Sequence, residues 1–98
     1  MITIEQIHQW AKPHPVGNNA KIVRLSNQDV LISIVGGDRG LYGDFENDFE
    51  IAIMDTDTHD FVTRHFFTEI NDDVKPYASI DEVVRIVNML MKGNFQVL

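Results

Sequence analysis

Residues 40–63 of this 98-residue chain contain seven carboxylates and neither lysine nor arginine. The charges elsewhere nearly balance, so this one segment accounts for the net charge of −7. A field of one sign attracts an oppositely charged partner and steers it onto the surface that carries the charge. The candidate partner-binding residues are therefore the acids of this segment: Asp44, Glu46, Asp48, Glu50, Asp55, Asp57 and Asp60.

Three of these acids, Glu46, Asp48 and Glu50, occupy every second position of a predicted strand. Side chains at such positions share one face and lie about 6.8 Å apart. A row of carboxylates that no cation neutralises imitates the regularly spaced negative charge of a nucleic-acid backbone and fits a basic groove. The alternative is an ordinary solvated strand face, whose charges also deter pairing between sheets.

Two short motifs resemble ligand-binding loops but lack essential residues. The four glycines of residues 36–43 have no Walker pattern, and the acids that follow them would repel phosphate, which favours a simple connection between strands. Residues 55–60 resemble the start of a calcium loop, but Asp60 replaces the glycine at the sixth place and Phe66 the glutamate at the twelfth. Because Asp and Thr are common turn residues, we predict a turn over residues 55–58.

The other reactive side chains show no catalytic pattern. His8, His14, His59 and His65 lack the spacing of a zinc site, and the chain has no cysteine and no GxSxG motif. General acid catalysis by a carboxyl group needs a pKa raised by burial, which an open acidic strand does not provide. We therefore expect a protein that is not an enzyme and that uses no cofactor or metal.

Composition also limits the partner and the compartment. A net charge of −7 with only eight lysines and arginines lacks the basic patch that direct nucleic-acid binding needs. The absence of cysteine fits a reducing cytosol. The N-terminus has no basic region ahead of an apolar run, and no apolar run is long enough to span a bilayer. We expect a cytoplasmic protein that contacts neither nucleic acid nor membrane.

Two helices are predicted, one near each end of the chain. The first begins at a capping box in residues 3–6, continues with apolar residues at helical spacing, and ends before Pro13. The second begins at a similar capping box in residues 79–82 and ends near Gly93, because glycine commonly follows a helix.

Four strands are predicted between these helices, over residues 20–26, 29–36, 45–54 and 60–68. The first two form a hairpin across Asn27 and Gln28. The run from Val30 to Val35 is apolar on both faces except at Ser33, which indicates a central strand. The inward face of the last strand is left open. The order α-β-β-β-β-α predicts one acidic α+β domain over residues 1–98, with a four-stranded antiparallel sheet flanked by an N-terminal and a C-terminal helix.

Several segments resemble small uncharacterised phage and prophage proteins, over about residues 30–92. The residues that carry the resemblance are Gly40-Leu41-Tyr42-Gly43, Phe49-Glu50-Ile51-Ala52-Ile53, Phe61-Val62-Thr63, Tyr77 and Ile80-Asp81-Glu82-Val83-Val84. Proteins of this kind are similar in size and acidity to anti-CRISPR proteins and other phage inhibitors of host defence, several of which mimic nucleic acid. The resemblance implies a phage-encoded inhibitor acting in the host cytoplasm. The N-terminal helix departs from the pattern, which leaves the target open.

Two functions of different classes follow. The first is a non-enzymatic inhibitor whose acidic strand and turn dock on the basic, nucleic-acid-binding surface of a host defence protein, such as a CRISPR nuclease. The second is a small structural or regulatory phage protein that self-associates or contacts other proteins through apolar residues, namely Leu41, Tyr42, Phe66 and residues 95–98. A metal-dependent enzyme is the third alternative. The oligomeric state is left open.

Overall fold

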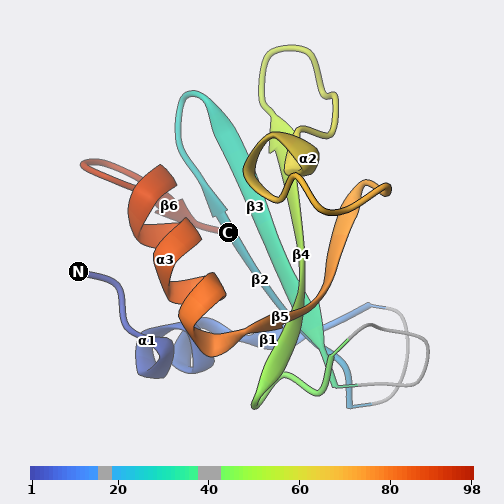
Figure 1. Cartoon of the computed structure of the whole chain (residues 1–98). Coiled ribbons are helices and arrows are strands. Elements are labelled where there is room, and N and C mark those ends of the chain that lie inside the picture. The colour runs from blue at the N-terminus through green and yellow to red at the C-terminus, as the bar shows by residue number, and fades with distance from the viewer. Residues whose placement is uncertain (16–18, 38–42) are drawn as a thin grey trace.

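The computed structural model describes residues 1–15, 19–37 and 43–98. Its strands pair antiparallel throughout, in the order β1-β2-β3-β4-β5, and β6 pairs with the same side of β2 as β1 does (Figure 1). The elements are α1 (Ile4–Trp10), β1 (Lys12–Pro13), β2 (Lys21–Ser26), β3 (Val30–Gly36), β4 (Asp48–Asp55), α2 (Thr63–Phe66), β5 (Val74–Ser79), α3 (Ile80–Leu90) and β6 (Gln96–Val97). The predicted α+β class with an antiparallel sheet is confirmed.

Both predicted capping boxes are present, and each fixes the start of its helix. At α1, the Thr3 hydroxyl accepts the N–H of Gln6 at 3.2 Å, and the Gln6 side chain accepts the N–H of Thr3 at 2.9 Å. At α3, Ser79 and Glu82 exchange the same two bonds. These bonds satisfy N–H groups that have no partner within the helix. α1 ends at Trp10, before the first proline, as predicted.

The predicted hairpin between β2 and β3 is also confirmed. Asn27 takes the place of a turn glycine by using its side chain: its Oδ1 accepts the N–H groups of Asp29 and Val30, both at 2.9 Å. Its backbone N–H donates to the carbonyl of Val30 at 3.0 Å. These local bonds set the register of the two strands, and an asparagine commonly makes them in turns.

The predicted strand over residues 60–68 is wrong, because residues 63–66 form the short helix α2. The strand that pairs with β4 is instead β5, in a stretch for which no strand was predicted. A register shift opposite Glu50 accommodates Pro76, which lacks an N–H, and Tyr77, whose φ is +52°. Proline is tolerated at bulges and on edge strands. The sheet therefore has five strands in a row, with β6 beside β2, and not four.

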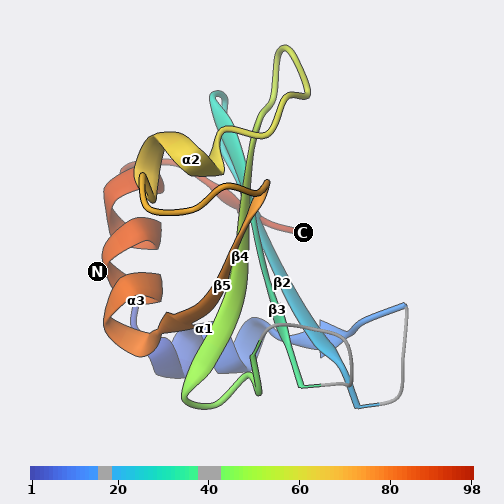
Figure 2. The same cartoon turned by 45° about the vertical axis from the view of Figure 1, so that its right-hand side comes forward.

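One face of the sheet carries the hydrophobic core. Helices α2 and α3 lie against this face, and α1 lies near the end where β4 begins (Figure 2). Alternate residues of β4 point into the core, as its two-residue repeat predicts. The fully buried large side chains are Phe45, Phe49, Ile7, Leu25, Ile32, Ile34, Ile51, Ile53, Ile86, Val23, Val83 and Val87.

Thr63 joins α2 to the sheet. It is the buried polar residue of the described chain, with 1% of its surface exposed. Its hydroxyl accepts the N–H of Ile53 at 2.9 Å and donates to the carbonyl of Asp73 at 2.6 Å. One side chain thus satisfies a backbone group of β4 and another just before β5. This accounts for the helical turn at a position whose sequence resembles a strand.

We predict that Thr63→Val lowers the free energy of unfolding by about 1–3 kcal/mol, because it leaves a buried N–H and a carbonyl without partners. Urea denaturation measures the change. Thr68→Val is the matched control, because Thr68 is exposed and its side chain bonds to none of the described residues. Equal effects of the two substitutions would contradict the bridging role of Thr63.

Candidate functional site

The first group of candidate acids lies in the turn before β4, which we call the first acidic turn (residues 44–48). Asp44 organises it: its Oδ1 accepts the N–H groups of Glu46 and Asn47, both at 2.8 Å, and of Asp48 at 3.2 Å. The carboxylate of Asp48 in turn accepts the N–H of Asp44 at 2.8 Å. Phe45, at φ +62°, points into the core and anchors the turn.

This turn corrects the predicted row of carboxylates. β4 begins at Asp48 and not at residue 45, so Glu46 lies outside the strand. Only Asp48 and Glu50 keep the expected two-residue spacing. Asp48 is also engaged by the backbone of Asp44, whereas Glu46 is exposed and free of such bonds to the described residues. Three evenly spaced carboxylates on one strand are therefore not present.

The hydrogen bonds around Asp44 also determine its charge. Backbone N–H groups, that of Asn47 first and then those of Glu46 and Asp48, stabilise the carboxylate and lower its pKa to about 2. Asp44 consequently remains negative at any physiological pH. Its role in the turn and its contribution to the acidic field depend on the same ionised group.

The second acidic turn (residues 55–60) begins at Asp55, the last residue of β4. The Oδ1 of Asp55 accepts the N–H of Asp57 at 2.8 Å and of Thr58 at 3.0 Å, which confirms the predicted turn. The same bonds, that of Thr58 first, lower the pKa of Asp55. Asp57 and Asp60 are exposed, and their carboxylates accept no hydrogen bond from the described residues.

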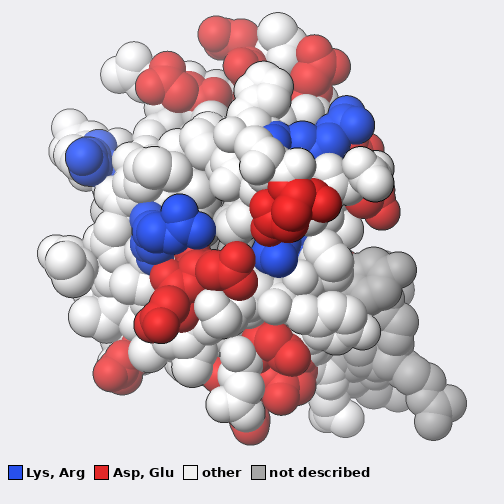
Figure 3. All heavy atoms as spheres, viewed as in Figure 1, with Lys and Arg blue, Asp and Glu red and all other residues white. Residues whose placement is uncertain are grey.

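The two acidic turns lie at opposite ends of β4, about 24 Å apart along the eight-residue strand. Figure 3 shows the corresponding separate groups of Asp and Glu at the upper and lower ends of the molecule. Glu50 belongs to neither turn. It lies on the outer face of the sheet beside Val35 and is followed there by Ala52 and Met54. The seven candidate acids thus form two groups joined by a mainly apolar strand.

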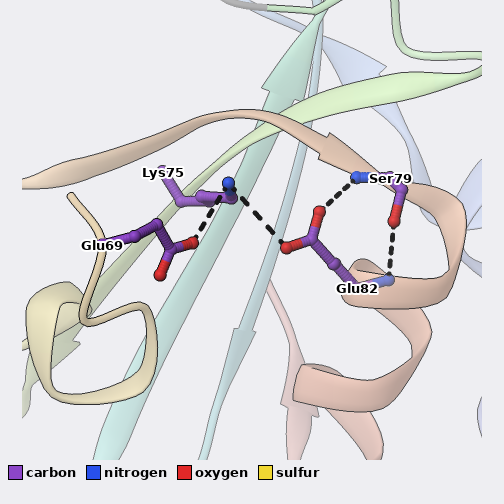
Figure 4. A network of polar contacts seen from close by, with 4 residues as sticks. All are labelled: Glu69, Lys75, Ser79 and Glu82. Carbon is purple, nitrogen blue, oxygen red and sulfur yellow. Dashed lines mark hydrogen bonds and ion pairs between the residues drawn. The ribbon is translucent and has the colours of Figure 1, made fainter.

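None of the seven acids forms an ion pair with a described lysine or arginine. The described ion pairs belong to Lys75, whose Nζ lies 3.2 Å from Glu69 and 3.8 Å from Glu82 (Figure 4). Glu82 also completes the cap of α3 through Ser79. Lys75 is therefore engaged by acids outside the candidate group, and no described lysine or arginine neutralises the acidic turns.

The histidines come from separate places in the fold. His8 packs on Phe45 at a ring distance of 5.5 Å and on Phe49 at 6.1 Å. His14 follows β1, His59 lies in the second acidic turn, and His65 is in α2. Within the described ranges, no three histidine, aspartate or glutamate side chains are grouped as metal ligands.

The apolar residues expected to mediate self-association do not share one described surface. Leu41 and Tyr42 lie outside the described residues, as does the middle of the four-glycine loop. Phe66 packs against the core, and Phe95 contacts Trp10 edge-to-face at a ring distance of 6.1 Å. Among residues 95–98, Leu98 reaches the outer face of the sheet.

Sequence reasoning missed this outer face as a surface of its own. The signal was present, because β3 is apolar on both faces apart from Ser33. The structure places its outward residue Leu31 beside Met54 of β4, on the side opposite the core. A strand with two apolar faces is typical of sheets that are covered on both sides.

The sequence matches no protein-family model, and neither curated proteins nor solved structures show a significant similarity to it. Among the described residues, no helix combines the length and the apolar character needed to cross a bilayer. The functional argument therefore depends on the chain's own charges and surfaces.

We predict that Asp44→Ala destabilises the protein at neutral pH and that this effect shrinks in acid. A folded-state pKa near 2, below the ordinary value of 3.8, gives the wild type stability that is present above about pH 4 and is lost as the pH falls towards 2. Urea denaturation of both proteins across this range measures the narrowing gap. A gap that stays constant with pH would show that the ionised carboxylate does not stabilise the turn.

The control is Glu46→Ala, in the same turn. Its side chain is exposed and accepts no hydrogen bond from the described residues. We expect it to change stability by less than about 0.5 kcal/mol, as most surface substitutions do.

Proposed function

We propose that the protein is a non-catalytic inhibitor that docks its acidic turns on a basic, nucleic-acid-binding surface of another protein. The observation that carries the proposal is the group of seven acids within residues 44–60, none of which pairs with a described cation. Such a field accelerates encounter with a basic groove and competes there with nucleic acid.

The acids divide into those that build the turns and those that are free to bind. Asp44, Asp48 and Asp55 accept backbone N–H groups and hold the turns in shape. Glu46, Asp57 and Asp60 are exposed and make no such bonds to the described residues. The rigid turns present the free carboxylates with little loss of conformational entropy on binding, which favours affinity.

The partner would contact both ends of β4 at once. A span of about 24 Å is too long for one side-chain cluster to cover but suits the length of a nucleic-acid groove, in which phosphates neutralised by lysine and arginine extend over many nucleotides. The proposal thus depends on total charge and span, and not on a regular spacing of carboxylates.

The class of partner follows from this chemistry and from the resemblance to phage proteins. We infer a host defence protein with a basic groove, such as a CRISPR nuclease, met in the host cytoplasm. The protein would occupy the groove without cutting or modifying anything, because its contribution is charge placed on a stable scaffold.

The test uses three substitutions that spare the turns: Glu46→Gln, Asp57→Asn and Asp60→Asn. At about 0.5–1 kcal/mol for each exposed charge, we expect this triple variant to bind roughly 10- to 100-fold more weakly to the basic protein that the wild type captures from host lysate. Binding is measured with the purified partner at low and high salt. Added DNA should displace the wild type from it.

The matched control removes three exposed acids elsewhere, through Glu5→Gln, Asp73→Asn and Asp81→Asn. It has the same net charge as the test variant. Retained binding by the control, with loss in the test variant, assigns the contact to the two acidic turns. Equal loss in both variants, or binding that DNA does not compete with, overturns the proposal.

A further inference from the structure

The outer face of the sheet, opposite the helices, contains an apolar hollow. Its volume is about 430 Å³. We call it the outer hollow, and its lining residues are Arg24, Leu31, Ser33, Ala52, Met54, Phe61, Val74 and Leu98. The small side chains of Ser33 and Ala52 face each other across β3 and β4 and form its floor. Figure 2, which shows the sheet nearly edge-on, has α2 and α3 on the other side.

The composition of this face differs from that of a solvated sheet. Where one face of an antiparallel sheet meets water, its outward positions are usually polar. Here the outward positions of β3 and β4 include Leu31, Ala52 and Met54. Two rim residues are also unusually exposed for apolar side chains, Phe61 at 43% and Leu98 at 45%. A contiguous apolar surface of this kind is typical of an interface.

Charges of opposite sign lie on the two sides of this face. On one side lie Lys12 of β1 and Arg24 of β2. Lys12 pairs with Ile22, and Arg24 pairs with the outward-facing Ser33, so both side chains point to the outer face. Glu50 of β4 lies on the other side of β3. Neither Arg24 nor Glu50 forms an ion pair with a described residue. The face is therefore basic at one margin, apolar in the middle and acidic at the other margin.

We propose that the outer face is the interface of a symmetric homodimer, with a second copy of this chain as its occupant. A two-fold axis that passes over β3 places β2 of one copy on β4 of the other. Arg24 is level with Ala52, and Glu50 lies two residues, about 6.8 Å, further along β4. The long Arg24 side chain of each copy therefore extends along the strand to Glu50 of its partner, and the pairing occurs twice because the interface is isologous. The same operation brings Leu98 of one copy towards the rim residue Phe61 of the other.

The available area suits a weak pair that dissociates on dilution. The sheet is five strands wide, with β1 and β6 sharing one position along β2, and neighbouring strands lie about 4.8 Å apart. Strands of seven residues at about 3.4 Å each set its length, so the face measures roughly 570 Å². Part of this face is already covered, because Ile22 and Val35 also point outward but are only 9% and 5% exposed. Two copies therefore bury less than twice this area, which places the interface at the small, weak end of the range, below about 1,200 Å². Face-to-face packing of two sheets is a common arrangement, with the inner side chains interdigitated.

The first test is the mass of the wild-type protein in solution. Sedimentation equilibrium over roughly a hundredfold range of concentration should show a species of twice the 11.2 kDa chain mass that dissociates on dilution. A single species of 11.2 kDa at every concentration overturns the proposal, and it would do so whether or not the acidic turns bind a basic partner.

The second test places a charge in the floor of the hollow. Ala52→Lys should raise the dimer dissociation constant by at least about 100-fold, because two unpaired ammonium groups would be buried in the interface. Met89→Lys is the matched control, since Met89 is an exposed apolar residue of α3, on the helical side. A dimer that is unaffected by Ala52→Lys, or weakened equally by Met89→Lys, contradicts the assigned face.

The third test uses charge exchange and is independent of how well Ala52→Lys folds. Arg24→Glu or Glu50→Arg alone should weaken the dimer by roughly 10- to 100-fold, because each creates like-charge contacts twice. The double variant restores opposite charges and should dimerise within about 10-fold of the wild type. Weakening that the double variant does not reverse would exclude the proposed pairing of Arg24 with Glu50.

Discussion

The two-residue repeat of β4 determines the roles of nearly every other part of this molecule. Because β4 lies between β3 and β5, its side chains alternate between the core and the outer face along its full length. Phe49, Ile51 and Ile53 anchor the core, whereas Glu50 and Ala52 define the outer surface. A shift of one residue would exchange these two sets, so the register has to be strongly specified. The bonds of Asp44 before the strand and of Asp55 after it supply that specification at both ends.

The parts of the fold that depend on local bonds were predictable from the sequence. The capping boxes at Thr3 and Ser79 and the hairpin at Asn27 involve side chains that bond backbone groups within a few residues. Their signals therefore lie in short stretches of sequence. The turn at Asp55 belongs to the same class. These features give the α+β class, the starts of α1 and α3, the junction of β2 with β3, and the end of β4.

The parts that depend on distant contacts were not predictable. Residues 60–68 are rich in aromatic and β-branched residues, but the hydroxyl of Thr63 bonds to Ile53 and Asp73, which lie ten residues away on each side. These bonds favour a helical turn over strand propensity. β5 was hidden for the opposite reason, because Pro76 and Tyr77 interrupt its pattern at a bulge that only the pairing with β4 explains.

The candidate site shows the same division between local and distant information. Charge counts, which need no structure, showed that its seven acids lie in a segment without lysine or arginine, and none of them pairs with a described lysine or arginine. Their arrangement was not predicted. The carboxylates of Asp44 and Asp48 each accept the backbone N–H of the other residue, and the turn that these bonds close leaves Glu46 outside the strand. An aspartate in a turn can accept backbone N–H groups or remain free to contact a partner, and sequence spacing alone does not distinguish the two uses.

The distribution of charge connects the two proposed surfaces. Glu50 stands apart from both acidic turns and faces the outer side of the sheet, where Arg24 is its natural counterpart in a second copy. The free acids Glu46, Asp57 and Asp60 lie in the turns beyond the ends of β4, outside the area where two sheets would meet. A face-to-face dimer therefore leaves them available and doubles their number. Since each added charge contact contributes only a little on an exposed surface, presenting two sets of acidic turns on one particle would raise the affinity for an extended basic groove more than any single substitution within one turn.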